Sequence, residues 1–212
     1  HRYVNPGDSI KESCIINEEI LKILEENVRF APLHNPAHLA CIKSCLEILP
    51  EVPNVPVFDT AFHQTMPDKT KLYAIPVEDY EKYGIRRYGA HGISHEYISQ
   101  EAIKYLNSIN APSEKIITCH LGNGSSITAV KNGKCFDTSM GMTPLVGVVM
   151  GTRTGSVDPS AVTFVADKHG FTPSQMSEYM NKKSGFLGVS GVGSDNRDVQ
   201  AASLEGNKRA QL

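Results

Sequence analysis

The stretch "HLGNGSSITAVKNGK", from His120 to Lys134, decides the fold class, because it places glycines and serines between two strand-like runs. Residues 116–119 and 127–130 are apolar and rich in β-branched side chains, which predicts two strands. Asn132-Gly133 predicts a two-residue hairpin turn. The run 122–126 should leave backbone N–H groups and hydroxyls pointing outward from a strand end, and such a row of donors can bind a phosphate.

The same glycines have an alternative interpretation, because bulges and close packing also require glycine. No Lys-Ser or Lys-Thr follows them, so the stretch is not a Walker loop. It also differs from a G-x-G-x-x-G turn that opens a helix. A ligand at this run would therefore bind between strands.

Composition excludes several classes of partner. The chain has 212 residues, 40% of them hydrophobic, with 21 basic and 23 acidic residues and no block of like charge. These values argue against nucleic acid or an anionic membrane as a partner and favour small molecules. No apolar run approaches the roughly 20 residues of a membrane span, and the first residues do not resemble a signal peptide. We therefore expect a cytoplasmic protein.

The cysteines are odd in number and show no C-x-x-C spacing, so we expect reduced, buried thiols. His38, Cys41 and Cys45 could share one helical face, a spacing that is compatible with a metal site. The apolar periodicity of residues 38–49 favours an ordinary core helix instead. The five cysteines are Cys14, Cys41, Cys45, Cys119 and Cys135.

Hydrophobic patterning predicts an α/β layer in the first part of the chain, with helices over 15–28 and 38–49 and a buried strand within 55–63. The polar, proline-bearing segment 64–76 is the expected domain boundary. After it we expect a helix from about Ser94 to Leu106, the hairpin, and two helices near 160–181.

Several reactive side chains lie beside glycine, proline or turn residues, where functional groups concentrate. Asp59 ends an apolar strand, so it is either a helix cap or a catalytic carboxylate. Arg153 either forms a surface ion pair or directs its guanidinium at anionic charge. The full set is Arg2, His34, Asp59, His91, His120, Arg153 and the group Asp195, Asn196 and Arg197.

His91 and His95 are four residues apart, a spacing that can place two imidazoles on one metal ion. Gly92 interrupts the first turn, however, and favours His91 just before a helix that contains a structural His95. The arginines, the donor loop, the strand-end aspartate and the histidines together are the groups that phosphoryl transfer requires.

Six ordered motifs resemble the acetate kinase (acetokinase) family over essentially the whole chain: "APLHNPA", "VFDTAFHQTMP", "RRYGAHGISH", "HLGNGSSITAVKNG", "DTSMGMTPLVGVVMGTRTGSVDP" and "SGVGSDNRD". The resemblance implies the acetate and sugar kinase/Hsp70/actin superfamily, with two RNase H-like α/β domains and usually a homodimer. Residues 1–63 would belong to the amino-terminal domain and 64–212 to the carboxy-terminal, nucleotide-binding domain. The chain resembles an internal fragment of the family's usual sequence, without the two ends of that sequence.

The resemblance also implies an activity, the magnesium-dependent in-line transfer of the γ-phosphoryl group of ATP to acetate, giving acetyl phosphate and ADP. It implies catalytic roles for Asp59, His91 and Arg153, and a role for Arg2 in binding the carboxylate or phosphate. The implied pocket for the methyl group of the acid is Val4, Leu33, Ala90 and Pro144. The implied nucleotide contacts are His120, Leu121, Gly122, Asn123, Gly124, Asp195, Asn196 and Arg197.

Two departures from the family pattern carry expectations. Asn5-Pro6-Gly7 stands where the family usually reads His-Gly-Gly, which should alter the local loop. Ala90 stands where the family has phenylalanine, which should widen the pocket toward propionate or butyrate. The resemblance assigns no magnesium ligand within this chain, and residues 1–212 alone are expected to be inactive.

Two functions of other classes are alternatives. One is a metallohydrolase built on His34, His91, His95 and His120. The other is a nucleotide-binding module without catalysis.

Overall fold

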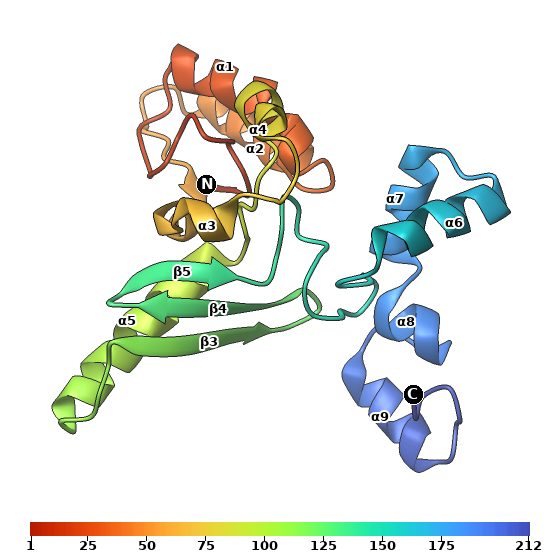
Figure 1. Ribbon diagram of the computed structural model, residues 1–212. Helices are drawn as coiled ribbons and strands as arrows, with labels where there is room; N and C mark the ends of the chain where they lie inside the picture. The colour runs from red at the N-terminus through yellow and green to blue at the C-terminus, as the bar shows by residue number, and fades with distance from the viewer. The chain divides into compact units, whose positions relative to one another are not determined.

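A computed structural model describes all residues, 1–212, and the chain divides into two compact units. The first unit comprises residues 1–119 and 128–144, and the second comprises residues 120–127 and 145–212. Both helices and strands are present (Figure 1), as the expected α/β class requires. None of the helices has the length and apolar character needed to cross a membrane.

The amino-terminal part of the first unit is a two-stranded parallel sheet with helices packed on it. Its elements are β1 (Arg2–Tyr3), α1 (Glu18–Glu26), the 3₁₀ helix η1 (Val28–Phe30), α2 (Asn35–Ile48) and β2 (Val57–Phe58). Arg2 pairs with Val57 and Tyr3 with Phe58. Burial of apolar surface stabilises this layer, and its core is Tyr3, Ile10, Ile16, Leu24, Ile42 and Phe58.

The rest of the first unit contains the elements from η2 to β5. They are η2 (Phe62–Thr65), α3 (Asp68–Lys71), α4 (Val77–Tyr83), α5 (Gly92–Ser108), β3 (Lys115–Leu121), β4 (Ser125–Lys131) and β5 (Lys134–Thr138). The sheet order is β3-β4-β5, and α5 runs along this sheet (Figure 1). The tip of the β3–β4 hairpin, residues 120–127, groups with the second unit.

The β4–β5 hairpin closes as the sequence predicts. Asn132 and Gly133 both have positive φ, 51° and 74°, which is the conformation of a type I′ turn. The two strands are antiparallel, with a register shift between Ala129 and Val130. This hairpin prediction is therefore confirmed.

The second unit contains four helices after the hairpin tip, namely α6 (Pro159–His169), α7 (Pro173–Lys182), α8 (Gly185–Ser190) and α9 (Asn196–Leu204). Local sequence sets their ends. Asp158 caps α6 by accepting the N–H of Ser160, and Thr172 forms a capping box with Gln175 at α7. The two helices predicted near 160–181 are thus confirmed.

Two sequence expectations need correction. The strand expected within 55–63 is only two residues long, because its partner β1 offers only two residues for pairing. The cysteines are free thiols, but only Cys135 is buried. Cys41 is exposed on α2, which buries only Asn35 and Ile42, and so is not a core helix through its length.

Candidate active site

Asp59 and Arg2 form the centre of the site in the first unit. The parallel pairing of β1 and β2 brings them together although they are 57 positions apart. Arg2 Nε donates to Asp59 Oδ1 at 3.0 Å and Arg2 Nη2 donates to Oδ2 at 2.6 Å. The Asp59 side chain is buried, whereas half of the Arg2 side chain is exposed. The bidentate hydrogen bond to Asp59 raises the pKa of Arg2, so this guanidinium stays charged and accessible.

Gly92, the residue after His91, approaches the backbone of the same aspartate closely. The Gly92 N–H donates to the Asp59 carbonyl at 2.7 Å, and a Cβ at Gly92 would lie 2.3 Å from that oxygen. His91 adopts a left-handed conformation with φ of 60°, which is uncommon for a residue other than glycine. Backbone strain of this kind concentrates at functional sites. The structure thus pairs the side chains of Arg2 and Asp59 and places the backbone that follows His91 against the Asp59 carbonyl.

His95 has a structural role, as the sequence analysis favoured. It lies within α5, which begins at Gly92 directly after His91. Its Nδ1 atom is 2.7 Å from Thr118 Oγ1, and the side chain is buried. His34, His91 and His95 do not gather as metal-binding side chains. The metallohydrolase alternative therefore has no site among these three histidines.

His63 supports the site, and the sequence analysis assigned it no role. Its Nε2 atom is 3.0 Å from the Ala90 carbonyl, which can only accept, so Nε2 carries the proton. Nδ1 therefore accepts from the Cys135 thiol at 3.1 Å. Complete burial lowers the pKa of His63 to about 4 and burial raises the pKa of Cys135 to about 12, so both are neutral near pH 7. This pair fixes the backbone beside His91.

A histidine four residues after a strand-end aspartate was the available sequence signal for His63. Its role could not be read from that spacing, because its partners are 27 and 72 positions away.

The residues implied for the acid's methyl pocket differ in burial. Val4 and Ala90 are almost completely buried, whereas Leu33 is 52% exposed and Pro144 is half-buried. Asn35 holds this region together, because its Nδ2 atom donates to the carbonyls of Asn5 and Asn27. The buried hydrogen bond from Asn35 to the Asn5 carbonyl thus fixes the backbone next to Val4.

The unusual Asn5-Pro6-Gly7 sequence makes its own tight turn. The Asn5 side chain accepts the N–H of Gly7 at 2.8 Å, and Gly7 has a φ of 73°. A glycine is required at this position because left-handed backbone is costly for other residues. The departure from the family pattern is therefore compatible with an ordered loop.

The glycine-serine run corrects one sequence expectation. Ser125 and Ser126 are buried, and Ser125 Oγ donates to the Gly122 carbonyl at 3.0 Å. Their hydroxyls therefore do not both point outward. The Gly122 N–H is also used, since it donates to the Gly124 carbonyl at 3.1 Å. What the loop exposes is Leu121, Gly122 and Asn123.

Asn123 is fitted against Gly151. The Gly151 N–H donates to the Asn123 carbonyl at 3.2 Å, and a Cβ at Gly151 would lie 2.2 Å from Asn123 Oδ1. The sequence assigned no role to Gly151, although it lies in the glycine-rich stretch before Arg153.

A groove of about 780 Å³ lies in the second unit. It brings residues 121–123 of the hairpin tip beside the turn Asp195, Asn196 and Arg197, whereas His120 and Gly124 do not line it. Asp195 caps α9 and pairs with Arg197 at 2.6 Å, and hydrogen bonds from Arg197 lower the pKa of Asp195 to about 2. Its lining residues are Leu121, Gly122, Asn123, Ser125, Val148, Val149, Phe186, Ser194, Asp195, Asn196 and Arg197.

Arg153 lies in the second unit, whereas Asp59 and His91 lie in the first. Its carbonyl accepts the N–H of Met150 at 3.1 Å, and its Nη1 atom is 3.7 Å from Met150 Sδ. Gly185 packs against this turn so closely that a Cβ there would lie 2.1 Å from the Met150 carbonyl oxygen. Desolvation lowers the pKa of Arg153. The structure therefore places this guanidinium on a tightly packed turn.

The structure matches known kinases over its whole length. The crystal structure of Porphyromonas gingivalis acetate kinase superposes with a TM-score of 0.89 at 47% identity and covers 100% of this chain and 53% of that one. A propionate kinase from Francisella tularensis superposes with a TM-score of 0.93 at 46% identity, covering 100% and 54%. The expected acetate and sugar kinase/Hsp70/actin fold class is confirmed for the part that this chain spans.

Sequence comparison gives the family. The model of the acetokinase family matches residues 1–212, and the chain belongs to this family. Acetate kinase 2 of Clostridium perfringens is 55% identical over 212 residues, which is 100% of this chain and 53% of that relative. An acetate kinase of Thermotoga maritima is 55% identical over 213 residues, with the same shares covered. The chain spans about half the length of the curated relatives it matches.

Proposed function

We propose that this protein is an acetate kinase, which transfers the γ-phosphoryl group of ATP to the carboxylate of acetate and forms acetyl phosphate and ADP reversibly. The observation that carries the proposal is the buried Asp59, held in bidentate contact with a half-exposed Arg2 and in backbone contact with the strained turn at His91. Membership of the acetokinase family supports the choice of reaction.

The proposed mechanism relies on positioning and charge. Acetate is already an oxyanion, so attack on phosphorus needs no strong general base, and the enzyme's task is alignment and charge neutralisation. Arg2 would bind the carboxylate of the acid in line with the phosphoryl group, while Asp59 orients Arg2. His91 and Arg153 would stabilise the negative charge that develops on the equatorial oxygens.

The groove in the second unit is the proposed nucleotide site. Its volume of about 780 Å³ lies within the roughly 300–1,000 Å³ typical of small-molecule sites. His120, Leu121, Gly122, Asn123 and Gly124 would form the phosphate loop, and Asp195, Asn196 and Arg197 would contact the rest of the nucleotide. The exposed Arg197 guanidinium supplies positive charge at the groove wall.

Magnesium would enter with ATP and neutralise part of the phosphate charge. Each carboxylate oxygen of Asp59 accepts one hydrogen bond from Arg2, and no residue is assigned as the magnesium ligand. Magnesium binds mainly through phosphates, one or two carboxylates and water. These ligand preferences are consistent with Mg²⁺ bound mainly to the phosphates of ATP.

Propionate or butyrate is the second candidate for the acid. Ala90 is buried where the family usually has a larger side chain, and the chain is similar to a solved propionate kinase. We also propose that the protein forms a homodimer and acts in the cytoplasm. The assignment of residues 1–63 and 64–212 to two RNase H-like domains remains a prediction.

The test is formation of acyl phosphate by the complete protein with ATP, magnesium and acetate, trapped as the hydroxamate. Product should require all three components, and Asp59→Asn should abolish most of it. Absence of hydroxamate with acetate, propionate and butyrate would overturn the proposal. Hydrolytic activity that a chelator abolishes in magnesium buffer would point instead to metal-dependent hydrolysis.

The chain 1–212 by itself should form no acyl phosphate, because it spans about half the length of its relatives. Turnover above background in the same hydroxamate assay would contradict this expectation. Binding of ATP without turnover would identify the chain as a nucleotide-binding module.

A further inference from the structure

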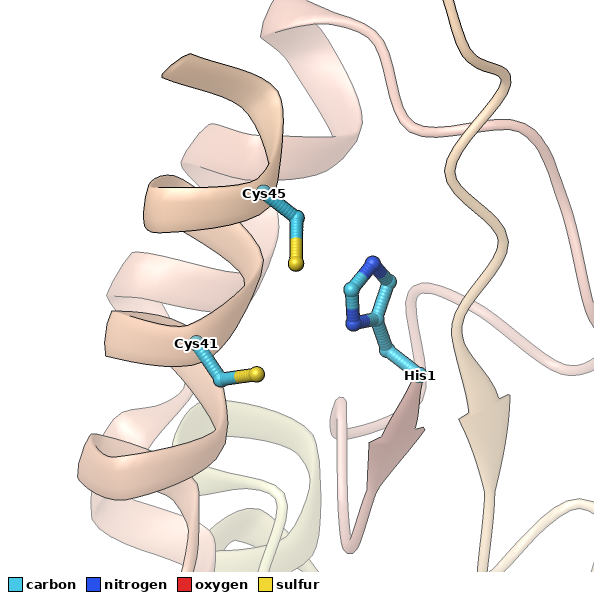
Figure 2. A group of neighbouring side chains, drawn as sticks. All are labelled: His1, Cys41 and Cys45. Atoms are coloured by element: carbon cyan, nitrogen blue, oxygen red, sulfur yellow. The ribbon is translucent and has the colours of Figure 1, made fainter. Parts of the chain in front are cut away.

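A cluster of metal-binding side chains lies outside the proposed active site. Cys41 and Cys45 are one helical turn apart on the same side of α2, and His1 faces them from the start of β1 (Figure 2). One potential ligand atom from each residue lies within 4.8 Å of the other two. The cluster is half-buried at His1 and Cys45 and exposed at Cys41.

Asn54 determines which nitrogen of His1 is available. Asn54 Nδ2 donates to the Val52 carbonyl at 2.8 Å, so its Oδ1 atom is the one that faces His1. Oδ1 lies 2.6 Å from His1 Nε2, and an amide oxygen can only accept. Nε2 therefore carries the proton, and in the neutral ring Nδ1 keeps its lone pair.

The orientation of the ring directs that lone pair toward the thiols. Figure 2 shows the ring edge that carries Nδ1 on the side of Cys41 and Cys45. A histidine that ligates a metal usually donates its other N–H to an oxygen acceptor, which fixes the tautomer and the ring orientation. Asn54 supplies this outer contact for His1.

The donor set selects the metal. Two thiolates and one imidazole favour zinc over magnesium or calcium, which prefer oxygen ligands. Zinc at about 2.3 Å from sulfur and 2.0–2.1 Å from nitrogen would hold these atoms roughly 3.5–3.8 Å apart. The separations in the structure are at most 4.8 Å, so they would have to shorten by no more than about 1 Å. Binding would release both thiol protons to solvent and leave a neutral Zn²⁺ complex.

We propose that His1 Nδ1, Cys41 Sγ and Cys45 Sγ form a three-ligand site for Zn²⁺, with its fourth position open to water beside the exposed Cys41. The helical spacing in the sequence predicts His38 beside these cysteines, and the apolar periodicity favours a core helix over a metal site. His38 instead packs against Tyr3 and His34, and His1 takes its place. Because His1 immediately precedes Arg2, the metal would tie the start of β1 to α2.

The test uses cobalt as a spectroscopic probe and zinc as the competitor. The reduced, metal-free protein should bind one equivalent of Co²⁺ with a thiolate-to-cobalt charge-transfer band, and Zn²⁺ should displace it. Cys41→Ser and Cys45→Ser should each weaken Zn²⁺ binding by more than the roughly 10- to 100-fold typical of losing an outer contact. Cys119→Ser is the matched control, because Cys119 is an exposed cysteine on β3 and outside the cluster.

Asn54→Ala provides a second measurement that does not alter a ligand. Zinc affinity should fall by roughly 10- to 100-fold while the charge-transfer band persists. The proposal is overturned if the unaltered protein shows no charge-transfer band, or if the band survives in both Cys41→Ser and Cys45→Ser. Loss of the band in Cys119→Ser would equally overturn it, because the thiolates would then lie elsewhere.

Discussion

The two units position their functional groups in different ways. In the first, Asp59, His63 and Asn35 are at most 3% exposed, and each has hydrogen-bond partners far away in sequence. In the second, the groove is lined by apolar residues and by polar groups such as Arg197, whose side chain is 88% exposed. Buried polar side chains with distant partners characterise the first unit, whereas the groove of the second unit presents more exposed groups; close backbone packing at a glycine occurs in both, at Gly92 and at Gly151.

This difference predicts how each unit responds to substitution. A buried polar group that loses its partner carries the full cost of desolvation, whereas an exposed group is solvated by water. Substitutions in the first unit should therefore affect stability and catalysis together. Substitutions at the groove of the second unit should mainly affect ligand binding.

The largest expected effect is a loss of kcat when one ionisable side chain is removed from either unit. In the complete enzyme, His91→Ala and Arg153→Ala should each lower kcat by roughly 10²- to 10⁴-fold, the range for groups directed at transition-state charge. KM for ATP should change little. Steady-state kinetics with the hydroxamate assay measure both constants, and a loss confined to KM would reassign the residue to ground-state binding.

The next largest effect is a pH-dependent change in the free energy of unfolding, caused by the buried His63. The unfolded chain protonates this histidine below about pH 6.5, whereas burial holds its folded pKa at about 4. The unfolded state then binds more protons between these values, so stability is complete above pH 6.5 and falls as the pH is lowered. The contribution lost by pH 4 is about 3 kcal/mol.

Urea unfolding at several pH values, with His63→Gln beside the unaltered protein, isolates this contribution from that of the carboxylates. The variant should lose less stability than the unaltered protein between pH 6.5 and pH 4. Parallel pH profiles for the two proteins would show that folding does not lower the pKa of His63.

The two units should also differ in how they tolerate a glycine-to-alanine substitution, at Gly92 in the first and at Gly122 in the second. In Gly92→Ala the new Cβ would meet the backbone oxygen of Asp59 at 2.3 Å, so unfolding free energy should fall by about 1–3 kcal/mol and activity should fall with it. In Gly122→Ala the nearest atom, the Gly124 oxygen, is 3.4 Å away, so stability should change by at most about 0.5 kcal/mol.

Gly122→Ala should nevertheless raise KM for ATP if phosphate approaches the loop backbone. Thermal unfolding and ATP kinetics on both variants separate the two effects. An unchanged KM for ATP in Gly122→Ala would show that Gly122 does not belong to the phosphate loop. Unchanged stability and activity in Gly92→Ala would contradict the close approach of Gly92 to Asp59.

The smallest effect concerns the choice of acid. A buried methylene contributes up to about 0.8 kcal/mol, and apolar pockets discriminate by about 1–3 kcal/mol per methylene. With Ala90, propionate and butyrate should compete unusually well with acetate, and Ala90→Phe should restore preference for acetate. The measurement is kcat/KM for the three acids in both proteins. Unchanged ratios would mean that neighbouring side chains already fill the space beside Ala90.

Much of the local structure was predictable from local patterns. The hairpin at Asn132-Gly133, the helix start after His91 and the capped helices near 160–181 depend on residues adjacent in sequence. Strand and helix periodicity are likewise short-range properties. The six ordered motifs also identified the family, which the family match confirms.

Sequence by itself determined the fold class and the family, because turns, caps and periodicity act over a few residues and the ordered motifs are contiguous. It also predicted the residue types of the site. Only the tertiary structure decided which distant groups meet: Arg2 with Asp59, His63 with Ala90, and His1 in place of His38 beside Cys41. It also turned the Ser125 hydroxyl inward and left Cys41 exposed. These outcomes depend on packing between segments tens of residues apart, and no local pattern encodes that packing.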